Sequence, residues 1–326
     1  MSKEITVSVI MPILNEEKYI DRCIESLLVQ DYPQKNMEWL FVDGGSVDAT
    51  LDILNSYSEK YSDLIFTFHN PLKTPPNAMN IGIEKARGRY VIRLDAHAKY
   101  PVDYISRCVY HLENTDADNV GGVAKTVGAG FVGECNAEIL SSKFGVGNSS
   151  FRTGSKGGYV DTVPFGAFKK EIFERIGTFN TELTRSEDND INSRIREAGG
   201  KVYLAPDISF EYYCRDTLGG LLKQAYQNGN ALFLTLKKNL KAMSVRHFIP
   251  FLFFLSILIM PILCAFLGVF RILFLFEMLI YFLLDFCFSV SSKRKGGFFY
   301  KLFMYPLFHL VYGLGSFVGM LGFKVY

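Results

Sequence analysis

An aspartate and a histidine, Asp95 and His97, stand two residues apart after the run Tyr90-Val91-Ile92-Arg93-Leu94, which is apolar except for Arg93. Side chains two positions apart on an extended chain point to the same side, so one divalent cation could touch both. Carboxylate oxygens and imidazole nitrogens are common ligands of such ions. The alternative is a strand that ends in a turn, with a solvated aspartate and a surface histidine. The surrounding sequence must decide between these two interpretations.

The composition excludes several classes of function. Lysine and arginine total 35 against 33 for aspartate and glutamate, so a formal net charge of +2 gives no basic excess that would favour a nucleic acid partner. The six cysteines include no Cys-x-x-Cys pair. This spacing argues against a disulfide framework or a zinc site and favours free thiols in a reducing compartment.

Short apolar runs alternate with helical patterns in the N-terminal part of the chain. Strands are predicted at residues 5–11, 37–42, 65–69 and 90–95, and polar loops and helices follow them. After the second strand, two glycines permit a tight turn and Ser46 could cap the next helix. Parallel sheets place ligands at the carboxyl ends of their strands. The pattern therefore predicts an α/β fold and favours the cation site at Asp95.

Several short motifs occur in a fixed order along this sheet pattern. They are Pro12-Ile13-Leu14-Asn15-Glu16, Asp43-Gly44-Gly45-Ser46, Ala78-Met79-Asn80, Arg87-Gly88-Arg89-Tyr90 and Asp95-Ala96-His97. As an ordered set they resemble glycosyltransferase family 2. The resemblance implies the GT-A fold, a Rossmann-like mixed sheet that binds nucleotide-diphosphate sugars, for a catalytic domain at residues 1–235.

The resemblance also implies a donor site. Pro12, Asn15 and Glu16 would line the pocket for the base and ribose of the nucleotide. Asp43 would hydrogen-bond the uracil-like edge of the base, and Asn80 would sit near the same pocket. These expectations favour a UDP-linked sugar as the donor.

An acidic stretch over residues 186–190 looks like the Glu-Asp motif in which the family keeps its general base, and Asp188 takes that place. Glu187 and Asp190 would then be partners of the base or of the helix dipole. The alternative is that Ser186 caps a helix and the acids only complement its dipole. The other motifs favour the catalytic interpretation of Asp188.

The cation site differs from the family motif, which has a second aspartate where this chain has His97. Asp95 and His97 would hold Mn²⁺ or Mg²⁺ against the leaving diphosphate. Because imidazole suits transition metals better than hard cations, the histidine favours Mn²⁺. One base without a second carboxylate nucleophile predicts a metal-dependent, inverting hexosyltransferase.

The C-terminal region, residues 247–326, is apolar enough to enter a membrane. Hydrophobic segments are predicted at 248–270, 272–290 and 302–323, the last either spanning or re-entrant, and an interfacial helix at about 216–240. Basic residues precede the first segment and separate the second from the third, which predicts a cytoplasmic catalytic domain. Glu277 and Asp285 are costly in lipid and should face protein or an interface.

Within the family, the chain looks like bacterial membrane-attached exopolysaccharide enzymes of the succinoglycan glucosyltransferase type. This resemblance rests on Asp95-Ala96-His97, Val163-Pro164-Phe165-Gly166-Ala167-Phe168 and the C-terminal segments. It implies a lipid-pyrophosphate-linked oligosaccharide as acceptor, at the bacterial inner membrane, in exopolysaccharide, capsule or O-antigen synthesis.

Three alternatives stay open at this point. A polyprenyl-phosphate sugar transferase would use the lipid phosphate itself as acceptor. A processive synthase would carry Gln-x-x-Arg-Trp, but Gln224 is followed by Ala225-Tyr226-Gln227-Asn228, and three segments are few for a channel unless a homo-oligomer supplies more. A non-catalytic membrane scaffold would not need Asp43, Asp95 and Asp188.

Overall fold

The computed structural model describes residues 5–154, 156–183 and 185–324. These residues form two compact units. The sheet unit comprises the chain up to Lys125 together with Gly154–Tyr212, and the helical unit comprises Thr126–Thr153 together with Tyr213 and the residues after it. The predicted domain limits, residues 1–235 and 247–326, stay a prediction, and residues 325 and 326 lie outside the described residues.

Four parallel strands alternate with helices in the first part of the sheet unit. Every residue of β2 is buried, as expected for a strand covered on both faces. The strands are β1 (Val7–Ile13), β2 (Met37–Asp43), β3 (Ile65–His69) and β4 (Tyr90–Arg93), and the helices between them are α1 (Ile20–Leu28), α2 (Thr50–Lys60) and α3 (Pro75–Lys85).

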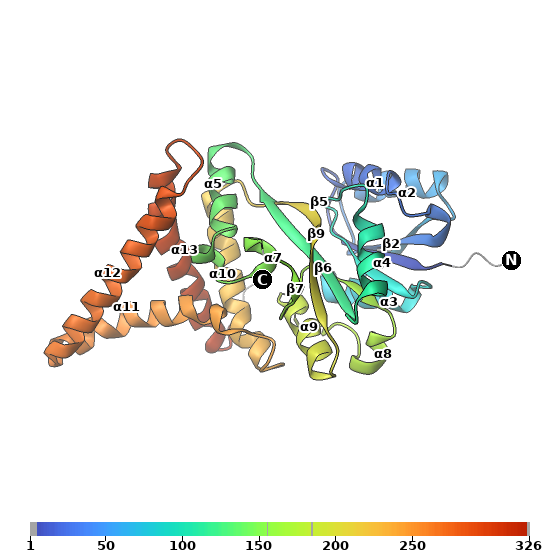
Figure 1. Cartoon of the computed structure of the whole chain (residues 1–326). Helices are drawn as coiled ribbons and strands as arrows, with labels where there is room; N and C mark the ends of the chain where they lie inside the picture. The colour runs from blue at the N-terminus through green and yellow to red at the C-terminus, as the bar shows by residue number, and fades with distance from the viewer. Residues whose placement is uncertain (1–4, 155, 184, 325–326) are drawn as a thin grey trace. The chain divides into compact units, whose positions relative to one another are not determined.

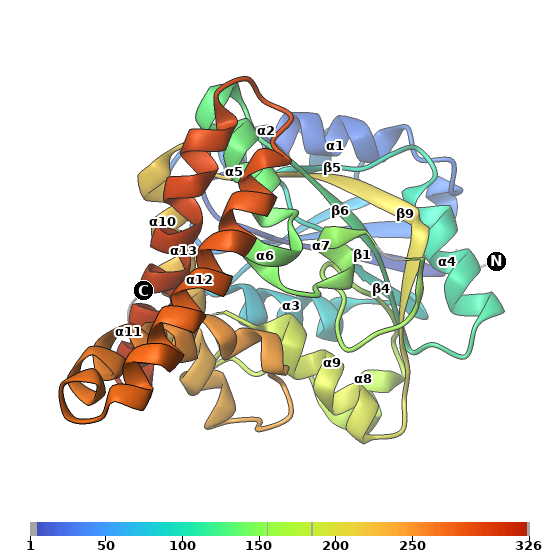
Figure 2. The same ribbon diagram turned by 60° about the vertical axis from the view of Figure 1, so that its left-hand side comes forward.

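The order of these strands reverses between β1 and β4. The chain runs outward from β1 through β2 to β3 and then returns to place β4 on the other side of β1. Helices α1 and α2 therefore lie on one side of the strands and α3 on the other (Figures 1 and 2). Ligands of doubly wound sheets bind where the strand order reverses. The loops after β1 and β4 meet at that point.

The other half of the sheet is antiparallel, which makes the whole sheet mixed. The order β3-β2-β1-β4-β8-β6-β9-β5 continues from β4, and β7 pairs with β9. The remaining strands are β5 (Ala98–Lys99), β6 (Asn119–Val127), β7 (Gly158–Tyr159), β8 (Ala167–Lys169) and β9 (Val202–Tyr213), with helices α4 (Tyr104–Asn114), α8 (Ile172–Ile176) and α9 (Glu187–Glu197).

Helix α3 packs directly on β1 at Gly82. A Cβ atom at this position would lie 2.4 Å from Cγ2 of Ile10, closer than real contacts allow. The glycine therefore brings the helix against the strand that carries the donor-site motif after it. A side chain at position 82 would therefore push α3 away from β1.

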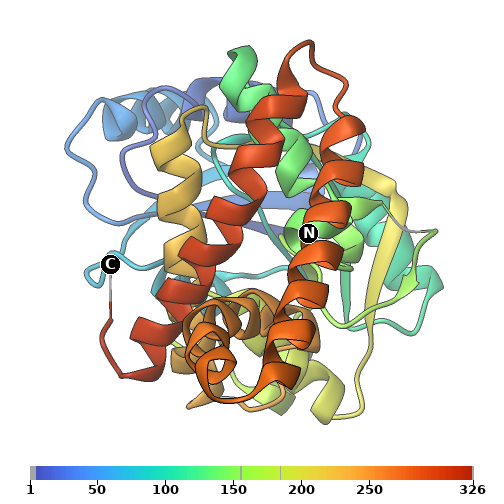
Figure 3. The same cartoon turned by 90° about the vertical axis from the view of Figure 1, so that its left-hand side faces the viewer.

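The helical unit consists of a few short helices and four long ones (Figure 3). Three helices are long and apolar enough to cross a membrane among the described residues: Val245–Phe266, Gly268–Val290 and Gly297–Met320. They include α11 (Ile249–Phe266), α12 (Gly268–Val290) and α13 (Gly297–Met320), and the unit also holds η2 (Val245–His247), α5 (Gly130–Leu140), α6 (Lys143–Val146), α7 (Ser150–Thr153) and α10 (Leu218–Leu236).

Helices α10 and α13 approach each other closely through glycines. A Cβ at Gly229 would lie 2.0 Å from the carbonyl oxygen of Tyr312, and one at Gly319 would lie 2.2 Å from that of Asn230. Small residues at such contacts let helix backbones pack tightly in a membrane. The placement of α10 on a membrane surface stays a prediction.

The acidic residues of the apolar helices have polar partners. Ser256 donates a hydrogen bond to Glu277 (2.6 Å), which joins α11 to α12. Asp285 is fully buried and accepts a hydrogen bond from Ser289 (3.1 Å). Both contacts agree with the expectation that these side chains face protein.

Candidate active site

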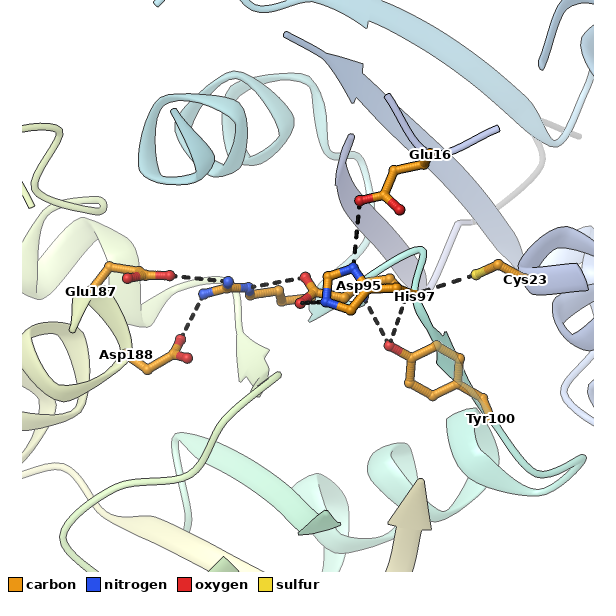
Figure 4. A network of polar contacts seen from close by, with 8 residues as sticks. Glu16, Cys23, Asp95, His97, Tyr100, Glu187 and Asp188 are labelled. Atoms are coloured by element: carbon orange, nitrogen blue, oxygen red, sulfur yellow. Dashed lines mark hydrogen bonds and ion pairs between the residues drawn. The ribbon is translucent and has the colours of Figure 1, made fainter. Parts of the chain in front are cut away.

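Arg93, the last residue of β4, is the centre of a cluster of acidic side chains. Figure 4 labels the three acids of this cluster, Asp95, Glu187 and Asp188. The side chain of Arg93 is only 6% exposed. Nη1 donates to the carboxylate of Asp188 (2.8 Å) and Nη2 to that of Glu187 (3.1 Å), while Nε lies 4.0 Å from Asp95 Oδ1. One guanidinium thus faces three carboxylates that come from two distant parts of the chain.

The opposite charges hold this cluster together. Burial alone would lower the pKa of Arg93, but Asp188, Glu187 and Asp95 together raise it above its ordinary value, so the side chain stays charged. Its guanidinium carbon also lies 5.7 Å from the centre of the Phe165 ring, within reach of a cation–π contact.

Asp188 and Glu187 occupy the first turn of α9. Ser186 stands at the N-cap position, but its backbone is left-handed (φ 62°) and its side chain makes no capping hydrogen bond. Ser186 therefore does not cap the helix through its side chain, contrary to the alternative interpretation of this stretch. Such a backbone conformation costs free energy for a residue other than glycine and occurs often at functional sites. Here it coincides with the turn that directs Asp188 to Arg93.

The environment of Asp188 suits a proton acceptor. Burial raises the pKa of Asp188 to about 7, against the effect of Arg93, which lowers it, while Glu187 and Asp95 add to the rise. The side chain is 24% exposed, so it remains open to an incoming hydroxyl group. A carboxylate with a pKa near the working pH is well matched to general base chemistry.

Asp95 and His97 lie together beyond the end of β4. Nε2 of His97 is 3.8 Å from Oδ2 of Asp95, and Nδ1 is 3.4 Å from Oε1 of Glu16 in the loop after β1. In metal-binding histidines, a carboxylate that bonds one ring nitrogen commonly orients the ring so that the other nitrogen can bind the metal. Asp95 and His97 are therefore the residues that could hold a divalent ion, with Glu16 positioning the imidazole.

The predicted nucleotide residues Pro12, Asn15, Glu16 and Asp43 lie at the ends of β1 and β2 and in the loop after β1. Pro12 pairs with Val42 inside the sheet. Asn15 has a left-handed backbone (φ 56°), and its side chain accepts a hydrogen bond from the Val47 amide (2.9 Å). The carboxylate of Asp43 accepts bonds from residues of its own turn, including the hydroxyl of Ser46 (2.6 Å).

These contacts assign Asp43 and Ser46 to the shape of the turn. Ser46 was expected to cap the following helix, but it bonds Asp43, and α2 begins at Thr50 after an uncapped Ala49. A contact of Asp43 with the nucleotide base stays a prediction, as do the roles of Pro12 and Asn15.

Asn80, on α3, has a clear structural partner. Its amide nitrogen donates to the carbonyl oxygen of Phe179 (2.8 Å), and its amide oxygen accepts from the Phe179 backbone nitrogen (2.8 Å). This pair fixes the segment that leads towards α9. Its predicted contact with the nucleotide stays a prediction.

The sequence reasoning missed Arg93 as a functional residue. A signal was available, because an arginine at the end of the apolar run Tyr90-Val91-Ile92 must find carboxylates if the strand is buried. The acids at 187 and 188 were the natural partners. The Glu16 contact with His97 gave no comparable signal, because only the strand order brings the two loops together.

Comparisons with known proteins now decide the family. The profile described as "Glycosyl transferase family 2" matches residues 8–177. The chain belongs to glycosyltransferase family 2. A dolichyl N-acetyl-alpha-D-glucosaminyl phosphate 3-beta-D-2,3-diacetamido-2,3-dideoxy-beta-D-glucuronosyltransferase of Methanococcus voltae is 31% identical over 239 residues, which cover 71% of this chain and 74% of the relative.

A second family 2 relative and a solved structure complete the comparison. The succinoglycan biosynthesis protein ExoA of Rhizobium meliloti (strain 1021) is 29% identical over 244 residues, covering 74% of this chain and 73% of the relative. The mannosyltransferase PcManGT from Pyrobaculum calidifontis, solved with GDP-Man and Mn²⁺, matches with a TM-score of 0.63 and 19% identity, over 96% of this chain and 88% of that one. The predicted GT-A fold and the exopolysaccharide resemblance of this glycosyltransferase are thus confirmed.

Replacing Arg93 should destabilise the sheet unit. Arg93→Leu leaves Glu187 and Asp188 largely buried without their cation, which should lower the free energy of unfolding by about 3–5 kcal/mol. The loss should be largest above about pH 7, where Asp188 is ionised, and shrink towards acid, because protonated carboxyl groups no longer need a cation. Urea unfolding of the detergent-solubilised chain measures it. Arg93→Lys, which keeps the charge, should lose less free energy of unfolding. Equal stability of Arg93→Leu and the wild type at neutral pH would contradict this role of Arg93.

Proposed function

We propose that this glycosyltransferase moves a sugar from a UDP-linked donor to a lipid-pyrophosphate-linked oligosaccharide. The observation that carries the proposal is the cluster around Arg93, which brings the candidate base Asp188 near the candidate metal ligands Asp95 and His97. The three apolar helices support a lipid-linked acceptor, because they would hold the enzyme at a membrane.

Asp95 and His97 would hold Mn²⁺ or Mg²⁺. The bound ion would neutralise the negative charge that develops on the leaving diphosphate. One carboxylate and one imidazole fit a first-row transition ion, so the donor set favours Mn²⁺. Among the described residues no group of three or more His, Cys, Asp or Glu side chains is placed to hold an ion. Donor oxygens and water would therefore have to complete the coordination.

Asp188 would accept the proton of the attacking acceptor hydroxyl. Arg93 would act as a positioning residue, since it bonds the carboxylate of Asp188 at 2.8 Å and has Asp95 on its other side. Glu187 shares the same guanidinium and holds it in place. With one base and no separate carboxylate nucleophile, the transfer would proceed by single displacement with inversion at the anomeric carbon.

The proposed setting is the cytoplasmic face of the bacterial inner membrane, in exopolysaccharide, capsule or O-antigen synthesis. The name of one relative specifies a dolichyl phosphate-linked sugar as acceptor, and the other relative takes part in succinoglycan biosynthesis. Both names support a saccharide carried on lipid or built into a polymer.

The test of the proposal is a transfer assay with the base removed. Membranes that contain the protein are supplied with Mn²⁺, radiolabelled UDP- and GDP-sugars and lipid extracts from a polysaccharide-producing host. Asp188→Asn should bind donor normally but transfer about 10²–10⁴-fold more slowly, the usual contribution of a general base. Glu197→Gln, the same change of carboxylate to amide at the other end of α9 and outside the Arg93 cluster, is the matched control and should retain most of the activity.

The labelled product identifies the acceptor. Label in a mild-acid-labile lipid oligosaccharide that disappears in Asp188→Asn would support the proposal and name the donor sugar. Label in plain polyprenyl phosphate would favour the polyprenyl-phosphate transferase instead. Nucleotide binding without transfer from any donor would favour the non-catalytic scaffold. Activity of Asp188→Asn within about tenfold of wild type would exclude Asp188 as the base.

Loss of His97 should weaken the response to metal. His97→Ala removes one of the two proposed protein ligands. The Mn²⁺ concentration that gives half-maximal transfer should therefore rise at least about tenfold. Electron paramagnetic resonance of unbound Mn²⁺ measures the same change without turnover. His111→Ala, in a histidine that instead bonds Asp207 (2.8 Å), is the control. An unchanged Mn²⁺ requirement in His97→Ala would remove His97 from the site.

A further inference from the structure

The helical unit contains a pocket that the transfer reaction does not use. Its volume is about 580 Å³, within the usual range for small-ligand sites. The walls come from α5, the start of α6, the end of α12, the loop after it and the start of α13. Every lining residue belongs to the helical unit.

The pocket stands where an apolar helix gives way to a polar loop. Phe288 near the end of α12 and Ser291 just beyond it both line the wall, and Lys293 follows in the loop. A helix of this length and hydropathy that crosses a bilayer ends at the depth of the lipid headgroups. The pocket would therefore open among headgroups and not among acyl chains.

The acidic side chains in the wall are already paired with cations. Glu138 accepts bonds from Lys301 Nζ (3.1 Å), Ser292 Oγ (2.7 Å) and the backbone nitrogen of Lys293 (2.9 Å). Burial would raise the pKa of Glu138, but these bonds outweigh it and lower the pKa, so the carboxylate remains ionised against Lys301. Glu134 pairs in the same way with Arg294 (3.1 Å).

Two further cations remain in the wall after these pairs are formed. Lys143 and Lys293 line the pocket, are exposed, and form no ion pair with other described residues. Thr126 Oγ1 in the same wall is buried without a hydrogen-bond partner in the described part of the chain. The pocket thus offers surplus positive charge, which suits an anion with several acceptor oxygens.

We propose that this pocket binds the phosphate group of a membrane-lipid headgroup. Lys143 and Lys293 would contact the phosphate oxygens from two sides of the pocket, because one begins α6 and the other lies in the loop after α12. The paired Glu138 and Lys301 would form the floor that keeps the two walls together. Two kinds of lipid carry this chemistry, a lipid-linked saccharide diphosphate and a bulk anionic phospholipid, and the inference holds for either.

Native mass spectrometry of the detergent-solubilised full chain tests the proposal. The probes are polyprenyl diphosphate, phosphatidylglycerol and zwitterionic phosphatidylcholine. The anionic lipids should bind more tightly than phosphatidylcholine. Lys143→Ala and Lys293→Ala should each weaken anionic lipid binding about tenfold, the effect of one lost charge-assisted contact. Lys293→Ala keeps the backbone nitrogen that bonds Glu138, so the wall itself should survive.

Lys295→Ala is the matched control, because it removes the same charge from the same loop outside the pocket. It should leave lipid binding within about twofold of wild type. A loss of polyprenyl diphosphate binding alone in the pocket variants would identify a lipid diphosphate as the ligand, and an equal loss for phosphatidylglycerol would identify bulk anionic lipid. If all three substitutions weakened lipid binding equally, or if none of them did, the pocket would not be the lipid site. This outcome is independent of whether the chain transfers sugar.

Discussion

One buried arginine organises the candidate active site of this glycosyltransferase. Arg93 is 6% exposed and faces Asp188, Glu187 and Asp95. Burying the charge of the arginine would cost free energy without these carboxylates, and burying the carboxylates would cost free energy without the arginine. The cluster therefore fixes the start of α9 against the end of β4. Because the proposed general base Asp188 and the proposed metal ligand Asp95 share this cation, the proposed geometry for proton transfer and for departure of the diphosphate would depend on a single guanidinium.

The strand order explains why the cluster forms at this point. β4 returns to lie beside β1, so the loops after these strands meet at the reversal of the sheet. Alternation along the extended chain places Arg93 and Asp95 on the same side. The loop after β1 contributes Glu16 and the loop after β4 contributes His97, while Arg93, at the end of β4, faces α9. Sheet topology thus brings together groups that lie far apart in the sequence.

The local part of this arrangement was predictable from the sequence, and the long-range part was not. Apolar runs and turn residues are local signals, so the strands, Asp95 with His97, and the apolar helices could be anticipated. The Arg93–Asp188 contact joins residues 95 positions apart and depends on how α9 lies on the sheet. Likewise, Ser46 could be assigned to a cap by its position, whereas its bond to Asp43 follows from the conformation of the turn.

The pH dependence of a single turnover tests the central role of Asp188 most directly. Burial raises the pKa of Asp188 to about 7, and a general base works only when it is deprotonated. With saturating donor, Mn²⁺ and lipid acceptor, the rate of transfer should therefore rise with pH and level off above about pH 7, and the residual rate of Asp188→Asn should lack this rise. A wild-type rate that stays constant from about pH 5 to about pH 9 would contradict the account.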